Sequence, residues 1–202
     1  MSWCPRNAVK LRVVTHMWDL SQWRDCDPGA VNLSWPFRRS NRLEPLPVVR
    51  IVTALNTQQI QELIPHRHPF LWIDEVLDVT DVRVVARKLV PPDWDGFRGH
   101  YPGEPILPGV ILCEASMQAG AILVARRGLT DPSAALPVGN VPVAARLNHV
   151  KFKQMVRPND LLEIEADVTD RMGQTFFFSA KVRVGEKLVA TMDFACTSAP
   201  RP

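Results

Sequence analysis

The most regular pattern of apolar and polar positions lies in the last quarter of the chain. From Leu162 to Val168 every second residue is apolar, and the residues between them are charged. Because successive side chains of a β-strand point to opposite faces, this alternation predicts a strand with one buried and one solvent-facing side. Apolar runs flank this strand on both sides. Together they predict an antiparallel meander whose strands are residues 150–155, 161–169, 175–184 and 188–197.

Upstream of the meander the pattern predicts shorter elements. Residues 57–63 favour a short helix that ends before Pro65, because proline cannot supply the N–H that continues a helix. Residues 71–76 and 82–90 are apolar and rich in β-branched side chains, which predicts a hairpin of two strands. The stretch 91–108 is rich in proline and glycine and predicts an irregular loop.

A long helix is predicted between the two groups of strands. Residues 110–127 contain no helix breaker except Gly120, and before the terminal arginines only Glu114, Ser116 and Gln118 are polar. A helix that is apolar almost all round must be buried almost all round. We therefore expect an α+β fold in which a curved antiparallel sheet wraps around one long central apolar helix.

Composition and charge exclude several classes of protein. Hydrophobic residues make up 46% of the 202 residues and charged residues 22%, which is typical of a globular chain. No charge-free apolar run approaches the roughly 18 to 20 residues of a membrane-spanning helix. The net charge is +3, but residues 1–50 carry +4 and residues 51–202 carry −1. The main domain is therefore nearly neutral, which argues against nucleic acid as a partner.

The N-terminal quarter differs from the rest of the chain. Residues 1–50 hold four of the six tryptophans, show no clear periodicity and fit neither a secretory signal nor a transit peptide. Two interpretations stay open: a poorly ordered extension, or a misassigned start with translation beginning near Val52. We expect a single domain over residues 51–202. The four cysteines form no CxxC pair, so a reducing compartment, the cytoplasm, is expected.

The candidate chemistry centres on Glu114. A carboxyl group that burial keeps protonated near neutral pH is a ready general acid, although Glu114 could instead pair with a buried arginine or face solvent at a dimer seam. His100 lies in the loop that leads into the helix and is a candidate general base, although a loop histidine is commonly only a surface residue. The backbone N–H groups of Gly109 and Val110, at the helix N-terminus, suit an oxygen that develops negative charge.

Three stretches carry a family resemblance. Residues 99–118 read Gly-His-Tyr-Pro-Gly-Glu-Pro-Ile-Leu-Pro-Gly-Val-Ile-Leu-Cys-Glu-Ala-Ser-Met-Gln. This stretch resembles the core motif of the 3-hydroxyacyl-[acyl-carrier-protein] dehydratases of the FabZ type, enzymes of fatty acid biosynthesis. Residues 63–74 resemble the family's opening segment, and residues 151–160 resemble its downstream basic stretch. The resemblance runs from about residue 57 to residue 198 in the same order and leaves residues 1–50 outside it.

The resemblance implies the hotdog fold and a hydro-lyase reaction, in which a (3R)-3-hydroxyacyl thioester loses water to give the trans-2-enoyl thioester. It implies that His100 removes the C2 proton, that Glu114 helps the 3-hydroxyl group to leave, and that the Gly109 N–H polarises the thioester carbonyl. The implied partners are an acyl carrier protein that carries the 3-hydroxyacyl chain and a second copy of this chain. In such homodimers the histidine and the glutamate meet across the interface, and the dimers can assemble into a trimer of dimers. No cofactor is implied.

The resemblance also indicates a substrate-binding set. Its members are Gly109, Val110, Tyr101, Gln118 and Phe97. The family usually has Phe where Tyr101 stands, Met where Leu107 stands and Ala where Met117 stands, and it keeps two aromatic residues where this chain keeps only Phe97. These departures bear on the preferred acyl chain length. A glutamate and not an aspartate at position 114 argues against the sister group that also isomerises the double bond.

Two further features suggest chemistry that we do not expect. His66 and His68 flank Arg67, but no cysteine or carboxylate lies nearby at ligand spacing, so we expect no metal site. Cys113 points about 100° away from Glu114 around the helix. It is therefore expected to be a small buried residue and not a nucleophile.

The expected partner and the expected reaction each have alternatives. A basic patch for an acidic carrier protein would consist of Lys151, Lys153, Arg157, Arg126 and Arg127. The alternative is ordinary solvated charge. For the reaction, a hotdog acyl-thioesterase would hydrolyse the same kind of thioester, and a non-catalytic acyl-binding hotdog subunit would keep the pocket without turnover.

Overall fold

The computed structural model describes residues 54–200, and both hypotheses for the N-terminal quarter lie outside the described residues. Within this range the chain forms two α-helices and one antiparallel sheet of six strands. The helices are α1 (Thr57–Leu63) and α2 (Gly109–Thr130). The strands are β1 (Glu75–Val79), β2 (Arg83–Leu89), β3 (Asn140–Phe152), β4 (Leu161–Met172), β5 (Thr175–Val184) and β6 (Lys187–Pro200).

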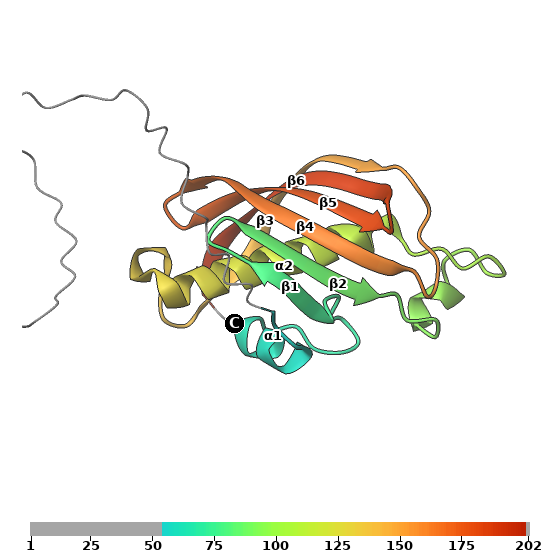
Figure 1. The fold of residues 1–202 in the computed structure, drawn as a ribbon, viewed down its shortest axis with the longest axis horizontal. Coiled ribbons are helices and arrows are strands. Elements are labelled where there is room, and N and C mark those ends of the chain that lie inside the picture. The colour runs from blue at the N-terminus through green and yellow to red at the C-terminus, as the bar shows by residue number, and fades with distance from the viewer. Residues whose placement is uncertain (1–53, 201–202) are drawn as a thin grey trace, which may run out of the picture. The chain divides into compact units, whose positions relative to one another are not determined.

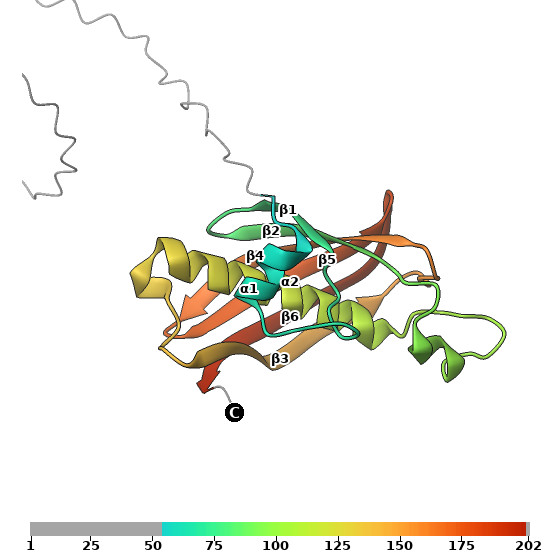
Figure 2. The ribbon, with the colours of Figure 1, turned by 90° about the horizontal axis from the view of Figure 1, so that it is seen from below.

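The sheet curves over α2, which lies along its concave face (Figures 1 and 2). The strand order is β1-β2-β4-β5-β6-β3, so the predicted meander of β4, β5 and β6 is confirmed. One row of paired residues crosses four strands, with Val84 opposite Ala166, Ala166 opposite Ala180, and Ala180 opposite Met192. All four are at most 1% exposed, because this row lies on the buried face of the sheet. The predicted alternation of β4 is therefore confirmed.

Helix α2 fills the space inside the curved sheet, as its apolar sequence predicts. It contacts β2, β3, β4, β5 and β6. The approach is closest at Gly120, where an added methyl group would lie 2.8 Å from ring atoms of Phe194. The helix is long and apolar enough to cross a membrane by those two criteria alone, yet 67% of its most apolar window is buried inside the domain. It is the core helix of a hotdog fold.

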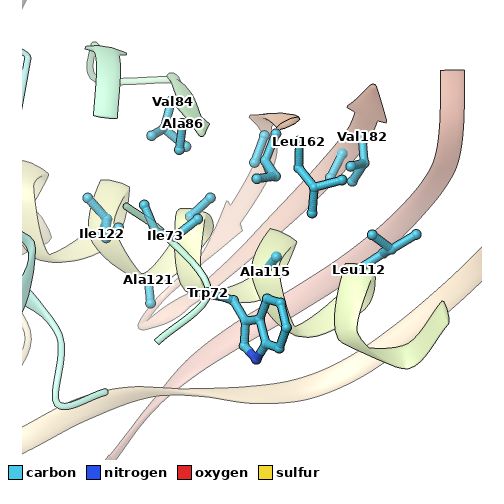
Figure 3. Packing of buried hydrophobic residues seen from close by; sticks show 14 of the residues in the cluster. Trp72, Ile73, Val84, Ala86, Leu112, Ala115, Ala121, Ile122, Leu162 and Val182 are labelled. Carbon is cyan, nitrogen blue, oxygen red and sulfur yellow. The ribbon is translucent and has the colours of Figure 1, made fainter. Parts of the chain in front are cut away.

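The segment before β1 forms part of the core but not part of the sheet. The sequence predicts a strand over residues 71–76, and the structure starts β1 only at Glu75. Trp72 and Ile73 are instead packed against α2 at 1% and 0% exposure (Figure 3). The backbone N–H of Trp72 donates to the side-chain oxygen of Gln118 at 2.8 Å. A helix side chain therefore replaces the strand partner that the prediction assumed.

Strand β3 is the largest error of the sequence-based prediction. A strand was expected over residues 150–155, and the structure extends β3 from Asn140 to Phe152 along β6. Residues 143–149 of this strand are exposed on both faces. No alternation therefore marks it in the sequence. Among the described residues β3 has a neighbour on one side only, so its other edge is unpaired.

Candidate functional site

A chain of aromatic contacts holds the His100 loop against the core. The short 3-10 helix Asp95–Arg98 buries Phe97, whose ring packs edge-on against Trp94 at a centroid distance of 5.4 Å. Trp94 packs edge-on against the buried Trp72 at 5.1 Å. The His100 N–H then donates to the carbonyl of Phe97 at 3.3 Å. Phe97 is 8% exposed and thus fixes the His100 loop to the core.

The side chain of His100 is fixed in one tautomer. Its Nδ1 lies 2.8 Å from the carbonyl oxygen of Ile106. A carbonyl oxygen only accepts hydrogen bonds, so Nδ1 carries the hydrogen in this contact. In the neutral ring Nε2 then keeps its lone pair, which is the form that a general base requires.

A cavity of about 390 Å³ connects His100 with the start of α2. Its lining residues are His100, Tyr101, Glu104, Ile106, Leu107, Gly109, Leu112, Phe152, Gln154, Met155 and Val156. Tyr101 is 63% exposed and adopts a φ of 54°, so the loop turns sharply beside the histidine. The cavity therefore has an apolar wall, one imidazole and one helix N-terminus.

The N-terminus of α2 offers backbone donors to this cavity. Pro108 precedes the helix and supplies no side-chain cap, and Gly109 is the first helical residue. The N–H groups of a helix's first turn have no partner within the helix, so those of Gly109 and Val110 are available. Phe152 covers Gly109 so closely that an added methyl group would lie 2.8 Å from its ring. Val110 itself is 68% exposed.

Glu114 lies on α2 about 7.5 Å along the helix axis from Gly109. The sequence predicts a buried carboxyl group, and the structure corrects this: the side chain is 20% exposed. The reason is a stripe of α2, at Val110, Glu114 and Met117, that the sheet of this chain leaves partly exposed. Glu114 lines a second cavity, of about 250 Å³. That cavity is formed by Pro65, His66, Glu114, Met117, Gln118, Ala121, Val141, Pro142, Val143, Ala144 and Cys196.

Two side chains of the same chain approach Glu114. Gln118 donates a hydrogen bond to Glu114 Oε1 at 2.8 Å, and His66 Nε2 lies 3.4 Å from the same oxygen. The family resemblance places Gln118 in the substrate-binding set, whereas the sequence around His66 suggests only a metal site, which is not expected. His66 and Glu114 are 48 residues apart in the sequence, so the sequence gives no sign of their contact. His68, by contrast, lines a different cavity, next to Trp72 and Trp94.

Burial changes the ionisation of three groups around the core of the site. Burial lowers the pKa of His66 below its usual value, and the Glu114 carboxylate opposes this effect in part. Burial, with the nearby Glu114 charge, raises the pKa of the Cys196 thiol to about 12. Burial also raises the pKa of Cys113, which is 3% exposed. Cys113 is thus a buried thiol and not an activated nucleophile, as predicted.

His100 and Glu114 do not meet within one chain. They line two cavities that share no lining residue. The two cavities border different sides of α2, because Gly109 and Leu112 lie about half a turn around the helix axis from Glu114 and Met117.

The expected basic patch is divided by the structure. Lys151, Lys153 and Arg157 are exposed close to the His100 cavity, and Arg157 pairs with Glu104 at 2.9 Å. Arg126 and Arg127 follow near the opposite end of α2, about 25 Å from Gly109 along the helix axis. Arg127 there donates to the backbone carbonyl of Asp81. The five side chains do not form one surface.

The chain is similar to a well-defined group of proteins. Residues 64–193 match the family model of the FabA-like domain. The chain is 35% identical over 137 residues to the 3-hydroxyacyl-[acyl-carrier-protein] dehydratase FabZ of Clostridium perfringens, which covers 68% of this chain and 94% of that protein. It is 41% identical over 144 residues to the protein of the same name from Symbiobacterium thermophilum, covering 70% and 96%. Among solved structures, the dehydratase heterocomplex ApeI:P from Xenorhabdus doucetiae matches with a TM-score of 0.59 at 15% identity, over 70% of this chain and 91% of that one, which supports the fold.

Proposed function

The chain belongs to the FabZ-type dehydratases of the FabA-like family, and we propose that it removes water from a (3R)-3-hydroxyacyl-[acyl-carrier-protein] to give the trans-2-enoyl-[acyl-carrier-protein] in fatty acid biosynthesis. The observation that carries this proposal is the 390 Å³ cavity. It combines an imidazole whose Nε2 keeps its lone pair with a helix N-terminus, which are the two groups that proton abstraction next to a thioester carbonyl requires.

In the proposed reaction His100 Nε2 removes the proton from C2 of the acyl chain. The Gly109 N–H donates to the thioester carbonyl oxygen, which gains negative charge as the C2–H bond breaks. The electron pair left at C2 forms the double bond to C3 as the C3–O bond breaks. Glu114 gives its proton to the leaving hydroxyl group, which departs as water. The proton on His100 later restores the carboxyl group of Glu114 through solvent, so no net proton is consumed.

The reaction is proposed to occur in a homodimer with shared sites, His100 from one subunit and Glu114 from the other. Three surfaces of the chain support this arrangement. The stripe of α2 around Glu114 is partly exposed, β3 has an unpaired edge among the described residues, and apolar side chains along β3 are exposed. The largest are Leu147 at 42% and Phe152 at 52%. A second copy would bury all three surfaces and would bring its own catalytic groups to the two cavities. Assembly of three such dimers into a trimer of dimers is compatible with this pairing.

An acyl carrier protein is the proposed carrier of the substrate. Lys151, Lys153 and Arg157 lie near the cavity that holds His100, where an acidic partner would deliver a tethered acyl chain. Arg126 and Arg127 are left out of this proposal because they lie near the other end of α2. We place the reaction in the cytoplasm, consistent with Cys113 and Cys196 as free thiols.

Incubation of the purified full chain with a 3-hydroxyacyl-[acyl-carrier-protein] thioester tests the function. Mass spectrometry of the acyl chain should show loss of one water and an enoyl product. Release of free carrier thiol without the enoyl product would instead identify a thioesterase. An unchanged substrate, with the acyl chain bound, would identify a non-catalytic acyl-binding subunit. Either of the last two results contradicts the proposal.

A further inference from the structure

Glu114 has a histidine neighbour that the proposed reaction does not use. His66 Nε2 and the amide of Gln118 approach the same carboxylate oxygen, Oε1, at 3.4 Å and 2.8 Å. The other oxygen, Oε2, accepts no hydrogen bond from the described residues. The two carboxylate oxygens therefore have different surroundings, and this difference has a chemical consequence.

The orientation of the Gln118 amide is fixed by the backbone on both sides. The Trp72 N–H can only donate, so it must face the amide oxygen, which it does at 2.8 Å. The Phe70 carbonyl can only accept, so it must face the amide nitrogen, also at 2.8 Å. The remaining amide hydrogen points to Glu114 Oε1, which is an acceptor in either protonation state of the carboxyl group. When Glu114 is protonated, the proton is favoured on Oε2, because a carbonyl oxygen at Oε1 accepts these contacts more strongly than a hydroxyl oxygen would.

The backbone segment that carries His66 is held in place by its neighbour Arg67. The neighbouring Arg67 guanidinium donates to the carbonyl oxygens of Ile64, His66 and Gln61 at 2.8, 2.7 and 2.8 Å, which ties the segment to the end of α1. His66 Nδ1 is buried and has no hydrogen-bond partner among residues 54–200. A protonated ring would bury an N–H at Nδ1 with no acceptor, which is costly, particularly for a charged group. The favoured form is a neutral ring with its hydrogen on Nε2, the nitrogen that lies 3.4 Å from Glu114 Oε1.

Few other charges act on this pair. In the cavity around Glu114, β3 contributes only Val141, Pro142, Val143 and Ala144, which do not titrate. β6 contributes Cys196, whose thiol stays uncharged because its pKa is about 12. Arg67 is the one charged side chain of the same segment that acts on His66, and it opposes protonation of the ring. Glu114 is thus the principal electrostatic partner of His66.

We propose that His66 is a positioning residue for Glu114: its Nε2–H and the Gln118 amide together hold Oε1, and Oε2 is left as the oxygen that delivers the proton. This inference rests on the proposed role of Glu114 as the general acid. It assigns no contact with substrate to His66. It predicts that an uncharged donor at the position of Nε2 is sufficient for the role.

Two variants of His66 test the donor in the full-length protein. His66→Gln places an amide N–H near the position of Nε2, and His66→Leu fills similar space without a donor. We expect His66→Leu to lose about 10- to 100-fold in kcat, the range for a lost hydrogen bond to the carboxylate that forms as Glu114 gives up its proton, with KM changed by less than about threefold. We expect His66→Gln to keep kcat within about threefold of the original chain. Full kcat in His66→Leu, or equal losses in both variants with equal thermal midpoints, would overturn the proposal.

A second measurement does not depend on activity. Nitrogen NMR of the His66 ring should show hydrogen on Nε2, and Glu114→Gln should lower the pKa of His66 further, because the Glu114 charge is what raises it. Glu62→Gln, which removes an exposed carboxylate on α1, should leave that pKa unchanged. Hydrogen on Nδ1, or a pKa that ignores Glu114, contradicts the pairing even if the chain is an active dehydratase. The expected shift in a chain that forms no enoyl product would support the pairing and refute the proposed function.

Discussion

Gln118 donates one amide hydrogen to Glu114 Oε1 and the other to the Phe70 carbonyl, each at 2.8 Å. Its own oxygen accepts from the Trp72 N–H, and the side chain is 1% exposed. Both amide hydrogens and the amide oxygen of this buried side chain thereby have hydrogen-bond partners. Gln118 connects the candidate acid to the segment that precedes β1. The position of Glu114 therefore depends on the packing of a segment about forty residues away in sequence, as well as on its own helix.

Replacing Gln118 with Met should weaken both the fold and the site. The substitution keeps the length of the side chain but leaves the Trp72 N–H buried without an acceptor, which costs about 1 to 3 kcal/mol of unfolding free energy. Loss of the donor to Glu114 should also lower kcat. Urea unfolding and steady-state kinetics measure the two effects. Gln58→Met, the same change at an exposed position of α1, should alter neither.

Gly120→Ala should destabilise the protein although alanine favours helices. The new methyl group would lie 2.8 Å from the ring of Phe194, which is itself stacked on Phe178. Overpacking of this kind costs about 1 to 3 kcal/mol, against a gain of about 1 kcal/mol in helix propensity. The thermal midpoint should fall, and a second change, Phe194→Leu, should recover part of the loss. A higher midpoint for Gly120→Ala alone would show that α2 is not held so close to the sheet.

Stability should depend on pH through His66. The unfolded ring has a pKa near 6.5, and burial lowers the pKa in the folded chain. Between these two values the unfolded chain binds more protons, so the stabilisation by neutral His66 is complete above about pH 6.5 and is lost as the pH falls through the folded-state pKa. Urea unfolding at about pH 8 and about pH 5.5 should show a smaller loss in His66→Gln than in the original chain. An equal loss in both would mean that the ring titrates alike in the folded and unfolded chains.

Charge reversal at Lys153 should weaken recognition of the carrier and leave the chemistry unchanged. Lys153→Glu is expected to raise KM for the carrier-bound substrate about three- to tenfold, less so at high salt, without changing kcat. A short pantetheine thioester of the same acyl chain should show no change in KM. Arg126→Glu, near the far end of α2, is the matched control and should behave like the original chain. An equal effect of both substitutions would contradict the location of the docking surface.

The sequence predicts the core of the fold well because two of its elements have a clear pattern. β4 alternates with a period of two, and α2 lacks a polar face, so both are expected to be buried, and both expectations are confirmed. β3 could not be found in this way, because residues 143–149 are exposed and nothing in them alternates. Pairing with β6, a tertiary contact, makes that segment a strand.

The site could be predicted only at residues that are unusual in their own sequence surroundings. A lone glutamate in an apolar helix, and a histidine in a rigid loop before it, are visible in the sequence. The proximity of His66 to Glu114 is not visible, because it depends on how α1 and the segment after it pack on α2. The burial of Glu114 was overestimated for the same kind of reason. The apolar composition of α2 shows that the helix is buried, but it does not show which stripe of the helix the sheet leaves partly exposed.

The proposed dimer builds each active site from His100 of one subunit and Glu114 of the other. His100→Ala and Glu114→Gln should each lose at least about 100-fold in kcat while remaining folded, and His68→Ala should remain active. A mixed dimer of the two inactive variants has one site with both original groups and one with neither.

The most direct measurement is therefore dehydratase activity after the two inactive variants are refolded together in equal amounts. Random pairing makes half of the dimers mixed, so activity should return to about a quarter of that of the original chain. Activity that stays at the level of the separate variants, in a sample where mixed dimers are demonstrated by two distinguishable tags, would contradict the shared site.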